Sequence, residues 1–226
     1  MSYKTDFIEL MCRSGVLIFG DFTTKSGRKT PYFINTGNYR TGLQLRFLGE
    51  YYAGCIYDRV EDDFDLLFGP AYKGIPLVTA AAMSLAGLYK RDVRYAFNRK
   101  EQKDHGEGGG LVGAVPKDGD RVVIVEDVVT AGTAVRETVE LLKGVADVSY
   151  KALIVSVDRC ERGTGEVSAF KELEQTLGLR VCPIVTVYEI IEHLHNRELG
   201  GKVYIDDAMR EKMEAYLKEY GAADGR

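Results

Sequence analysis

Two adjacent acids at the end of an apolar run are the first residues whose types suggest chemistry. The segment Val122–Ala134 reads VVIVEDVVTAGTA, in which a β-branched run ends at Glu126 and Asp127 and a short turn leads into a helical pattern. Ligands of open α/β sheets bind at the carboxyl ends of strands, and a helix N-terminus offers free N–H groups to a phosphate. Ionised carboxylates accept hydrogen bonds, so they suit sugar hydroxyls or a metal. These features together predict a site for a phosphorylated sugar.

The turn after the acids does not match the commoner phosphate-binding motifs. It lacks the G-K-[ST] of a P-loop and the G-x-G-x-x-G of a dinucleotide-binding turn. The alternative is an ordinary strand–helix connection with exposed acids. The combination of two acids with Thr-Ala-Gly-Thr favours the phosphate site instead.

Cations occur in three further segments. Lys73 follows a strand pattern that ends at Gly69-Pro70, where its charge could meet a phosphate. The segment Arg99–Gly110, RKEQKDHGEGGG, has no apolar side chain, which predicts an exposed, mobile loop whose cations could close over a departing anion. Arg159 could bind a substrate carboxylate through two parallel hydrogen bonds. The alternatives are a solvated lysine, a solvated loop and a surface salt bridge.

These motifs together resemble a known family. Val122–Ala134 resembles the phosphoribosyl-diphosphate (PRPP) signature of the type I phosphoribosyltransferases. Four other segments resemble the orotate phosphoribosyltransferases among them: Phe22–Gly37 the orotate-contacting segment, Phe68–Leu77 the pyrophosphate loop, Phe97–Gly109 the catalytic loop and Val157–Gly163 the later arginine motif. The resemblance runs in order over about residues 20 to 165. It implies transfer of the 5-phosphoribosyl group from PRPP to orotate, giving orotidine 5′-phosphate and pyrophosphate in de novo pyrimidine (UMP) biosynthesis.

The resemblance also implies roles for individual residues. The catalytic residues would be Lys73, Lys103, His105 and Asp127. The PRPP contacts would be Lys25, Tyr72, Lys73, Arg99, Lys100, Lys103, His105, Glu126, Asp127, Val128, Val129, Thr130, Ala131, Gly132, Thr133 and Ala134. The orotate contacts would be Phe33, Ile34, Thr130 and Arg159. Many relatives have a second aromatic at the position of Ile34, so the family's ring stacking is expected to be weaker here.

Partners and cofactor follow from the same resemblance. Lys100 would serve the site of its own subunit, whereas Arg99, Lys103 and His105 would reach the neighbouring subunit's site, which requires a homodimer. Mg²⁺ would bridge the pyrophosphate and ribose hydroxyls of PRPP rather than occupy a protein cage, because Mg²⁺ keeps waters and binds substrate phosphates. The family's pyrophosphate loop often contains a cis non-proline peptide.

The elements that position these residues alternate between apolar strands and helices. Strand patterns at 66–68, 93–97, 122–125, 153–157 and 181–187 are separated by helical patterns, which predicts a mostly parallel sheet flanked by helices. The chain is expected to form a single domain over 1–226. Residues 1–60 break the rhythm, with helices near 3–12 and 43–60 and two short strands between them, and they are interpreted as an N-terminal cap. Residues 206–220 predict a final amphipathic helix.

Composition sets limits on function. The 226 residues carry 30 Lys and Arg against 34 Asp and Glu, so no overall attraction to nucleic acid or to anionic membrane is expected. No signal peptide or spanning segment is recognised, and four cysteines without a C-x-x-C pair favour reduced thiols in the cytoplasm. Two alternatives remain: a type I transferase acting on a purine or uracil, and a PRPP-sensing regulator that binds nucleic acid. The second would need an added binding element or a basic face.

Overall fold

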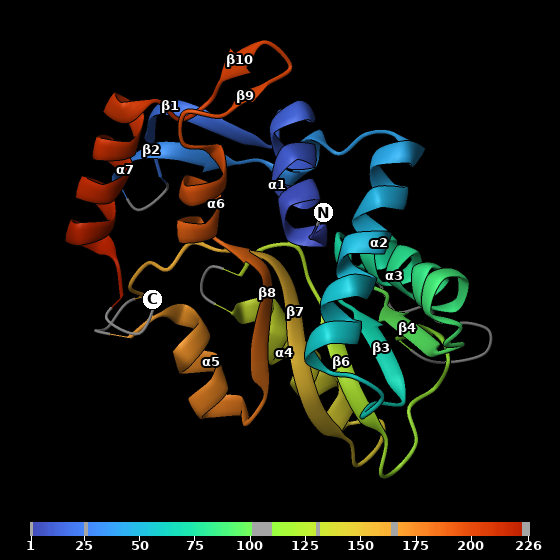
Figure 1. Ribbon diagram of the computed structural model, residues 1–226. Helices are drawn as coiled ribbons and strands as arrows, with labels where there is room; N and C mark the ends of the chain where they lie inside the picture. The colour runs from blue at the N-terminus through green and yellow to red at the C-terminus, as the bar shows by residue number, and fades with distance from the viewer. Residues whose placement is uncertain (1, 25–26, 101–109, 130–131, 164–166, 223–226) are drawn as a thin grey trace.

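A central six-stranded sheet organises the chain (Figure 1). The computed structural model describes residues 2–24, 27–100, 110–129, 132–163 and 167–222. The sheet has the order β5-β4-β3-β6-β7-β8, and only β5 runs antiparallel to its neighbour. Its strands are β3 (Leu66–Gly69), β4 (Arg94–Asn98), β5 (Leu111–Gly113), β6 (Arg121–Val125), β7 (Ser149–Asp158) and β8 (Arg180–Thr186). The predicted mostly parallel α/β architecture is confirmed.

Helices cover both faces of the sheet, which explains why its strands are apolar throughout. Alternate residues of one strand enter different cores: Val123 belongs to the core shared with α1 (Tyr3–Arg13), α2 (Gly42–Arg59) and α3 (Gly74–Tyr89). Its neighbour Ile124 belongs to the core shared with α4 (Thr133–Lys143) and α5 (Ala169–Leu177). Successive side chains of a strand point to opposite faces, so a strand covered on both sides needs an uninterrupted apolar run.

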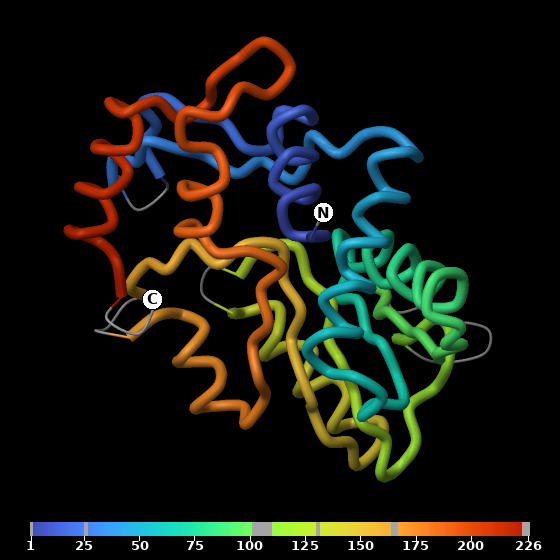
Figure 2. The backbone as a smooth tube through the Cα atoms, viewed as in Figure 1, coloured from blue at the N-terminus to red at the C-terminus, as the bar shows by residue number. Residues whose placement is uncertain are grey.

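The N-terminal segment packs against the C-terminal one. Strands β1 (Leu17–Thr23) and β2 (Lys29–Ile34) form an antiparallel hairpin. Helix α7 (Asp207–Tyr220) lies beside it, as the tube in Figure 2 shows, and the Tyr216 ring meets the Tyr32 ring edge-on with centroids 6.1 Å apart. Helix α2 packs on α3 and on the sheet through β7 and β8. The interpretation of residues 1–60 as a cap on a single domain stays a prediction.

Some predicted boundaries change in the structure. The strand predicted to reach Val187 ends at Thr186, because Thr186 and Glu189 form a capping box that starts α6 (Val187–Leu194). Several elements had no counterpart among the sequence predictions: β5, α6, the 3-10 turn Thr36–Asn38 and the small hairpin of β9 (Glu198–Leu199) and β10 (Lys202–Val203). The four cysteines are free and buried. Among the described residues, no helix is long and apolar enough to cross a membrane.

Candidate active site

The order in which the chain adds strands to the sheet reverses between β3 and β6, and the predicted site lies at that point. From β3 the chain passes through α3 to β4 on one side, and from β6 it passes through α4 to β7 on the other. The connections therefore leave a crevice outside the adjacent carboxyl ends of β3 and β6, where ligands of such sheets bind. Lys73 follows β3, and Glu126 with Asp127 follows β6.

Two helices begin at this crevice without a side-chain cap. Among the described helices, α1, α2, α5, α6 and α7 each start with a Ser, Thr or Asp side chain that accepts a backbone N–H. Lys73 precedes α3 and Gly132 precedes α4, and neither makes such a bond. The positive end of each helix dipole favours an anion, and the start of α4 can also offer N–H groups to a phosphate. At α3 the first two N–H groups already donate to the carbonyls of Pro70 and Tyr72, and the third residue is Pro76, so an anion there meets the helix dipole and the Lys73 ammonium. The two starts, on adjacent strands, can thus bind two phosphate groups.

Glycines allow the two turns to pack closely. Gly132 has a φ of +71°, and a Cβ there would lie 2.6 Å from Cδ2 of Leu173, so a larger residue would strain the backbone and force the Leu173 side chain to move. At the other turn, a Cβ on Gly69 would collide with the carbonyl oxygen of Gly74. The Ala71–Tyr72 peptide is cis, as the resemblance implies, and Asn98 Oδ1 accepts the Ala71 N–H at 2.8 Å.

A cavity of about 350 Å³ opens between these turns. It brings together most of the described residues that were predicted to contact PRPP. Its lining consists of Ala71, Tyr72, Lys73, Glu126, Asp127, Val128, Val129, Gly132, Thr133, Ala134 and Val135. The cavity therefore has, at each turn, a helix start without a side-chain cap. One turn adds a cation and the other an acid pair.

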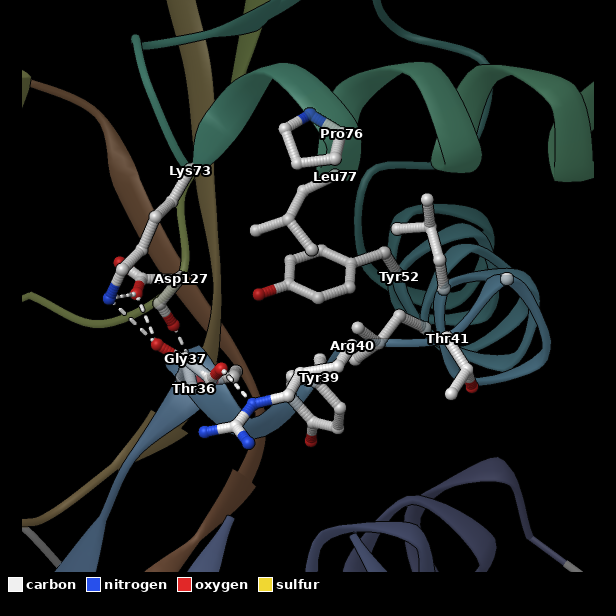
Figure 3. Close-up of a pocket in the computed structure, with 14 residues that line it drawn as sticks. Thr36, Gly37, Tyr39, Arg40, Thr41, Tyr52, Lys73, Pro76, Leu77 and Asp127 are labelled. Carbon is white, nitrogen blue, oxygen red and sulfur yellow. Dashed lines mark hydrogen bonds and ion pairs between the residues drawn. The ribbon is translucent and has the colours of Figure 1, made fainter.

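Lys73 and Asp127 are in direct contact across the crevice. Lys73 Nζ lies 2.7 Å from Asp127 Oδ2 and donates to Thr36 Oγ1 at 2.8 Å (Figure 3). The Thr36 hydroxyl also lies 2.7 Å from Asp127 Oδ2. The Lys73 side chain is 61% exposed and that of Asp127 only 14%, so the ammonium can leave for a ligand while the carboxylate stays in place.

The two acids differ in charge. Burial raises the pKa of Glu126 to about 8, and its Oε1 accepts the Asp127 N–H at 2.9 Å. Burial would also raise the pKa of Asp127, but hydrogen bonds from Lys73 and Thr36 outweigh it and hold that pKa below its ordinary value. Burial thus disfavours the charge on Glu126, and the bonds from Lys73 and Thr36 favour a negative charge on Asp127.

A second cavity of about 440 Å³ shares Lys73 and Asp127 with the first. Figure 3 shows Tyr39, Tyr52, Pro76 and Leu77 around it. Its walls are largely apolar and come from the starts of α2 and α3.

The described residues that were predicted to contact orotate, Phe33, Ile34 and Arg159, line neither cavity. Arg159 Nε donates to Glu161 Oε1 at 2.9 Å, and its guanidinium carbon lies 4.5 Å from the centre of the Tyr32 ring. Phe33 follows Tyr32 on β2, is 40% exposed, and packs on Phe22 with ring centroids 5.8 Å apart. Arg159 is thus next to the hairpin segment with which it was predicted to act, but an internal carboxylate occupies one edge of its guanidinium.

The remaining predicted residues are only partly described. Lys100 Nζ lies 5.7 Å from the centre of the ring of Tyr72, a residue that lines the cavity, and the Arg99 N–H donates to the Gly110 carbonyl at 2.6 Å. Ile34 is half-buried against the larger core. Lys25, Lys103, His105, Thr130 and Ala131 lie outside the described residues.

Three contacts of the acid pair involve residues that the sequence did not single out. Besides the Thr36 bond, Tyr52 Oη donates to the Glu126 carbonyl at 2.8 Å, and Ser156 Oγ donates to the Asp127 carbonyl at 2.5 Å. Ser156 reaches the acid pair because β7 pairs with β6, and no local sequence pattern reveals that pairing.

Comparison with known proteins gives one consistent family. A family model described as a phosphoribosyl transferase domain matches residues 43–162. The orotate phosphoribosyltransferase of Clostridium acetobutylicum is 56% identical over 219 residues, covering 97% of this chain and 98% of the relative. That of Lachnoclostridium phytofermentans is also 56% identical, covering 97% of each. The crystal structure of the Francisella tularensis orotate phosphoribosyltransferase superposes with a TM-score of 0.83 at 38% identity, covering 96% of this chain and 100% of that one.

Proposed function

The chain belongs to the orotate phosphoribosyltransferases of the phosphoribosyl transferase family, and from that premise we propose how its residues bind and convert the substrates. The enzyme transfers the 5-phosphoribosyl group of PRPP to orotate, which yields orotidine 5′-phosphate and pyrophosphate. One observation supports our placement of PRPP above all others. The only described helices without a side-chain cap, α3 and α4, start on either side of one acid pair.

PRPP spans the 350 Å³ cavity. Its 5′-phosphate binds the turn 130–134, where α4 begins, and its pyrophosphate binds Tyr72, Lys73 and the start of α3. Asp127 accepts hydrogen bonds from the ribose hydroxyls, and the protonated Glu126 lies beside it. This orientation puts each anionic end of PRPP on a helix start and its neutral sugar on the acids.

The residues act by position and charge, without a covalent intermediate. The C1′–oxygen bond to pyrophosphate breaks as a ring nitrogen of orotate attacks C1′ and gives up its proton to the departing pyrophosphate, through a transition state with oxocarbenium character. Lys73, Lys100 and Lys103 stabilise the charge that develops on the departing pyrophosphate, together with Arg99 and His105. Phe33, Ile34, Thr130 and Arg159 hold orotate, with Arg159 on its carboxylate.

The residues at the acid pair fit a magnesium ion that is bound mainly by PRPP. The described residues offer the Asp127 carboxylate with the Glu126 carboxyl group beside it, and no cluster of three or more Asp, Glu, His or Cys. Such a donor set suits an ion that keeps its waters and substrate oxygens. When bound, Mg²⁺ neutralises pyrophosphate charge, and Asp127 is placed to accept hydrogen bonds from its waters.

We also propose that the protein forms a homodimer whose active sites are shared between the two subunits. Helix α3 exposes 71% of Met83 and 57% of Leu88, which is consistent with an apolar contact surface. Lys103 and His105 of one subunit would complete the site of the other. The four free, buried cysteines support a reducing, cytoplasmic location.

A product assay tests base specificity. Purified protein is incubated with PRPP, Mg²⁺ and, separately, orotate, uracil, hypoxanthine or adenine. We expect pyrophosphate release and nucleotide formation with orotate only, because orotate alone among these bases has a carboxylate for Arg159 to bind. Strong turnover of another base would favour the purine or uracil alternative.

A further inference from the structure

Thr36 lies where three parts of the molecule meet. It follows β2, the strand that carries Phe33 and Ile34, and opens the 3-10 turn Thr36–Asn38. Its hydroxyl lies 2.7 Å from Asp127 Oδ2 and 2.8 Å from Lys73 Nζ. One side chain from the N-terminal hairpin thus contacts the acid after β6 and the cation after β3 (Figure 3).

The turn that carries Thr36 is held on both sides. The Asn35 side chain accepts the Gly37 N–H at 3.2 Å, and the Tyr39 N–H donates to the Thr36 carbonyl at 3.2 Å. Asn38 Nδ2 donates to the Gly15 carbonyl at 2.7 Å, which fastens the turn to the residues that precede β1. Thr36 therefore presents its hydroxyl to the crevice from a fixed backbone.

The chemistry of a hydroxyl suits this position. It has one proton to donate and lone pairs to accept, so it can donate to the Asp127 carboxylate while accepting from the Lys73 ammonium. Asp127 is mostly buried, and a buried carboxylate depends on such donors to stay ionised. When Lys73 turns to the pyrophosphate, Thr36 is the side-chain donor that still holds the Asp127 carboxylate among the described contacts.

We propose that Thr36 is a positioning residue for the ribosyl transfer. Its hydroxyl fixes the Asp127 carboxylate for the ribose hydroxyls and ties the acid pair to the hairpin that carries the orotate segment. This inference rests on the function proposed above, and it adds a residue that the family resemblance did not assign.

The test compares Thr36→Val, which removes the hydroxyl at nearly constant shape, with Thr36→Ser, which keeps it. Thr79→Val is the matched control, because the Thr79 hydroxyl bonds only the Ile75 carbonyl of its own helix among the described contacts. We expect Thr36→Val to lower kcat/KM for PRPP about tenfold, the loss of one charge-assisted hydrogen bond. The acidic limb of its pH profile should move to higher pH, since Asp127 loses a donor that lowers its pKa.

Thr36→Ser should restore at least half of the wild-type kcat/KM, and Thr79→Val should match the wild type. A double-mutant cycle adds a second measurement: Thr36→Val should cost little more in an Asp127→Asn background, because the shared bond is already altered. Orotate turnover by the wild type tests the proposed function separately. If the wild type turns over orotate while Thr36→Val keeps the wild-type kcat/KM and pH profile, the inference about Thr36 is overturned. Additive effects with Asp127→Asn would overturn it as well.

Discussion

Replacing Lys73 by methionine tests the charge arrangement of the crevice. Methionine keeps the apolar stem of the side chain and removes the ammonium, which lies 2.7 Å from Asp127 Oδ2. In the unliganded protein the lost ion pair is worth about 1 kcal/mol, because the Lys73 side chain is 61% exposed and solvent screens it. The loss in catalysis is larger. Removing one preorganised donor to developing charge costs about 10²-fold or more in rate, so kcat/KM for PRPP should fall by about that factor.

The same substitution should change the pH profile. Lys73 is one of two side chains that hold the pKa of Asp127 below its ordinary value against the effect of burial. Without it, burial raises that pKa, and the protein loses activity at a higher pH on the acidic side. The free energy of unfolding follows the same sign. Its difference between wild type and variant is greatest above the ordinary carboxylate pKa, about 3.9, and shrinks as the pH falls through the lower pKa of the native state.

The assay is initial-rate kinetics at saturating orotate over a series of pH values, with thermal unfolding of each variant as the check on folding. Lys212→Met is the control, because Lys212 is an exposed lysine of α7 whose nearest acid, Asp21, is 3.8 Å away. A Lys73→Met enzyme with kcat/KM for PRPP within twofold of wild type and an unmoved acidic limb would refute the assignment of this lysine to the pyrophosphate.

Three further experiments test the remaining groups. Arg159→Ala should raise the orotate KM more than tenfold while the KM for PRPP stays within a factor of three; an unchanged orotate KM contradicts the carboxylate assignment. Glu126→Gln should retain more activity than Asp127→Asn, because the Glu126 pKa of about 8 leaves it neutral at pH 7; equal losses in kcat would contradict the single-charge pair. Mixed and reassociated Lys73→Ala and Lys103→Ala subunits should recover about a quarter of wild-type activity, since half the dimers have one intact site; no recovery would contradict shared sites.

The sheet could be predicted because burial on both faces produces a local sequence pattern. Runs such as Val122–Val125 are apolar at every position, and helical patterns separate them. Boundaries were harder where two apolar elements join. Val187 continues the apolar run of β8, yet Thr186 and Glu189 form the capping box that starts a helix there. That signal was present in the sequence, and the apolar run concealed it.

The charged residues of the candidate site could be predicted from the sequence, but its contacts between distant segments of the chain could not. Lys73 and Asp127 stand at strand ends, so sequence order alone brings them to one edge of the sheet. The Thr36 contact depends on how the N-terminal hairpin folds back over 91 residues of chain, which no local spacing encodes. The same limit applies to Arg159. Its Glu161 partner is two residues away, but only the fold decides whether that carboxylate or a ligand is nearer.

The distribution of helix caps explains how the crevice stays ready for anions. A side-chain cap contributes about 1 kcal/mol to a helix, and five of the seven helices in the described chain have one. Capping α4 would stabilise the unliganded protein, but the capping oxygen would occupy the N–H groups that a phosphate needs, and Gly132 supplies no such oxygen. At α3 the first N–H groups donate to the Pro70 and Tyr72 carbonyls, so the Lys73 ammonium and the helix dipole are what this end offers to an anion. Phosphate binding at α4 therefore stabilises the folded protein through the contacts that a capping side chain would otherwise make.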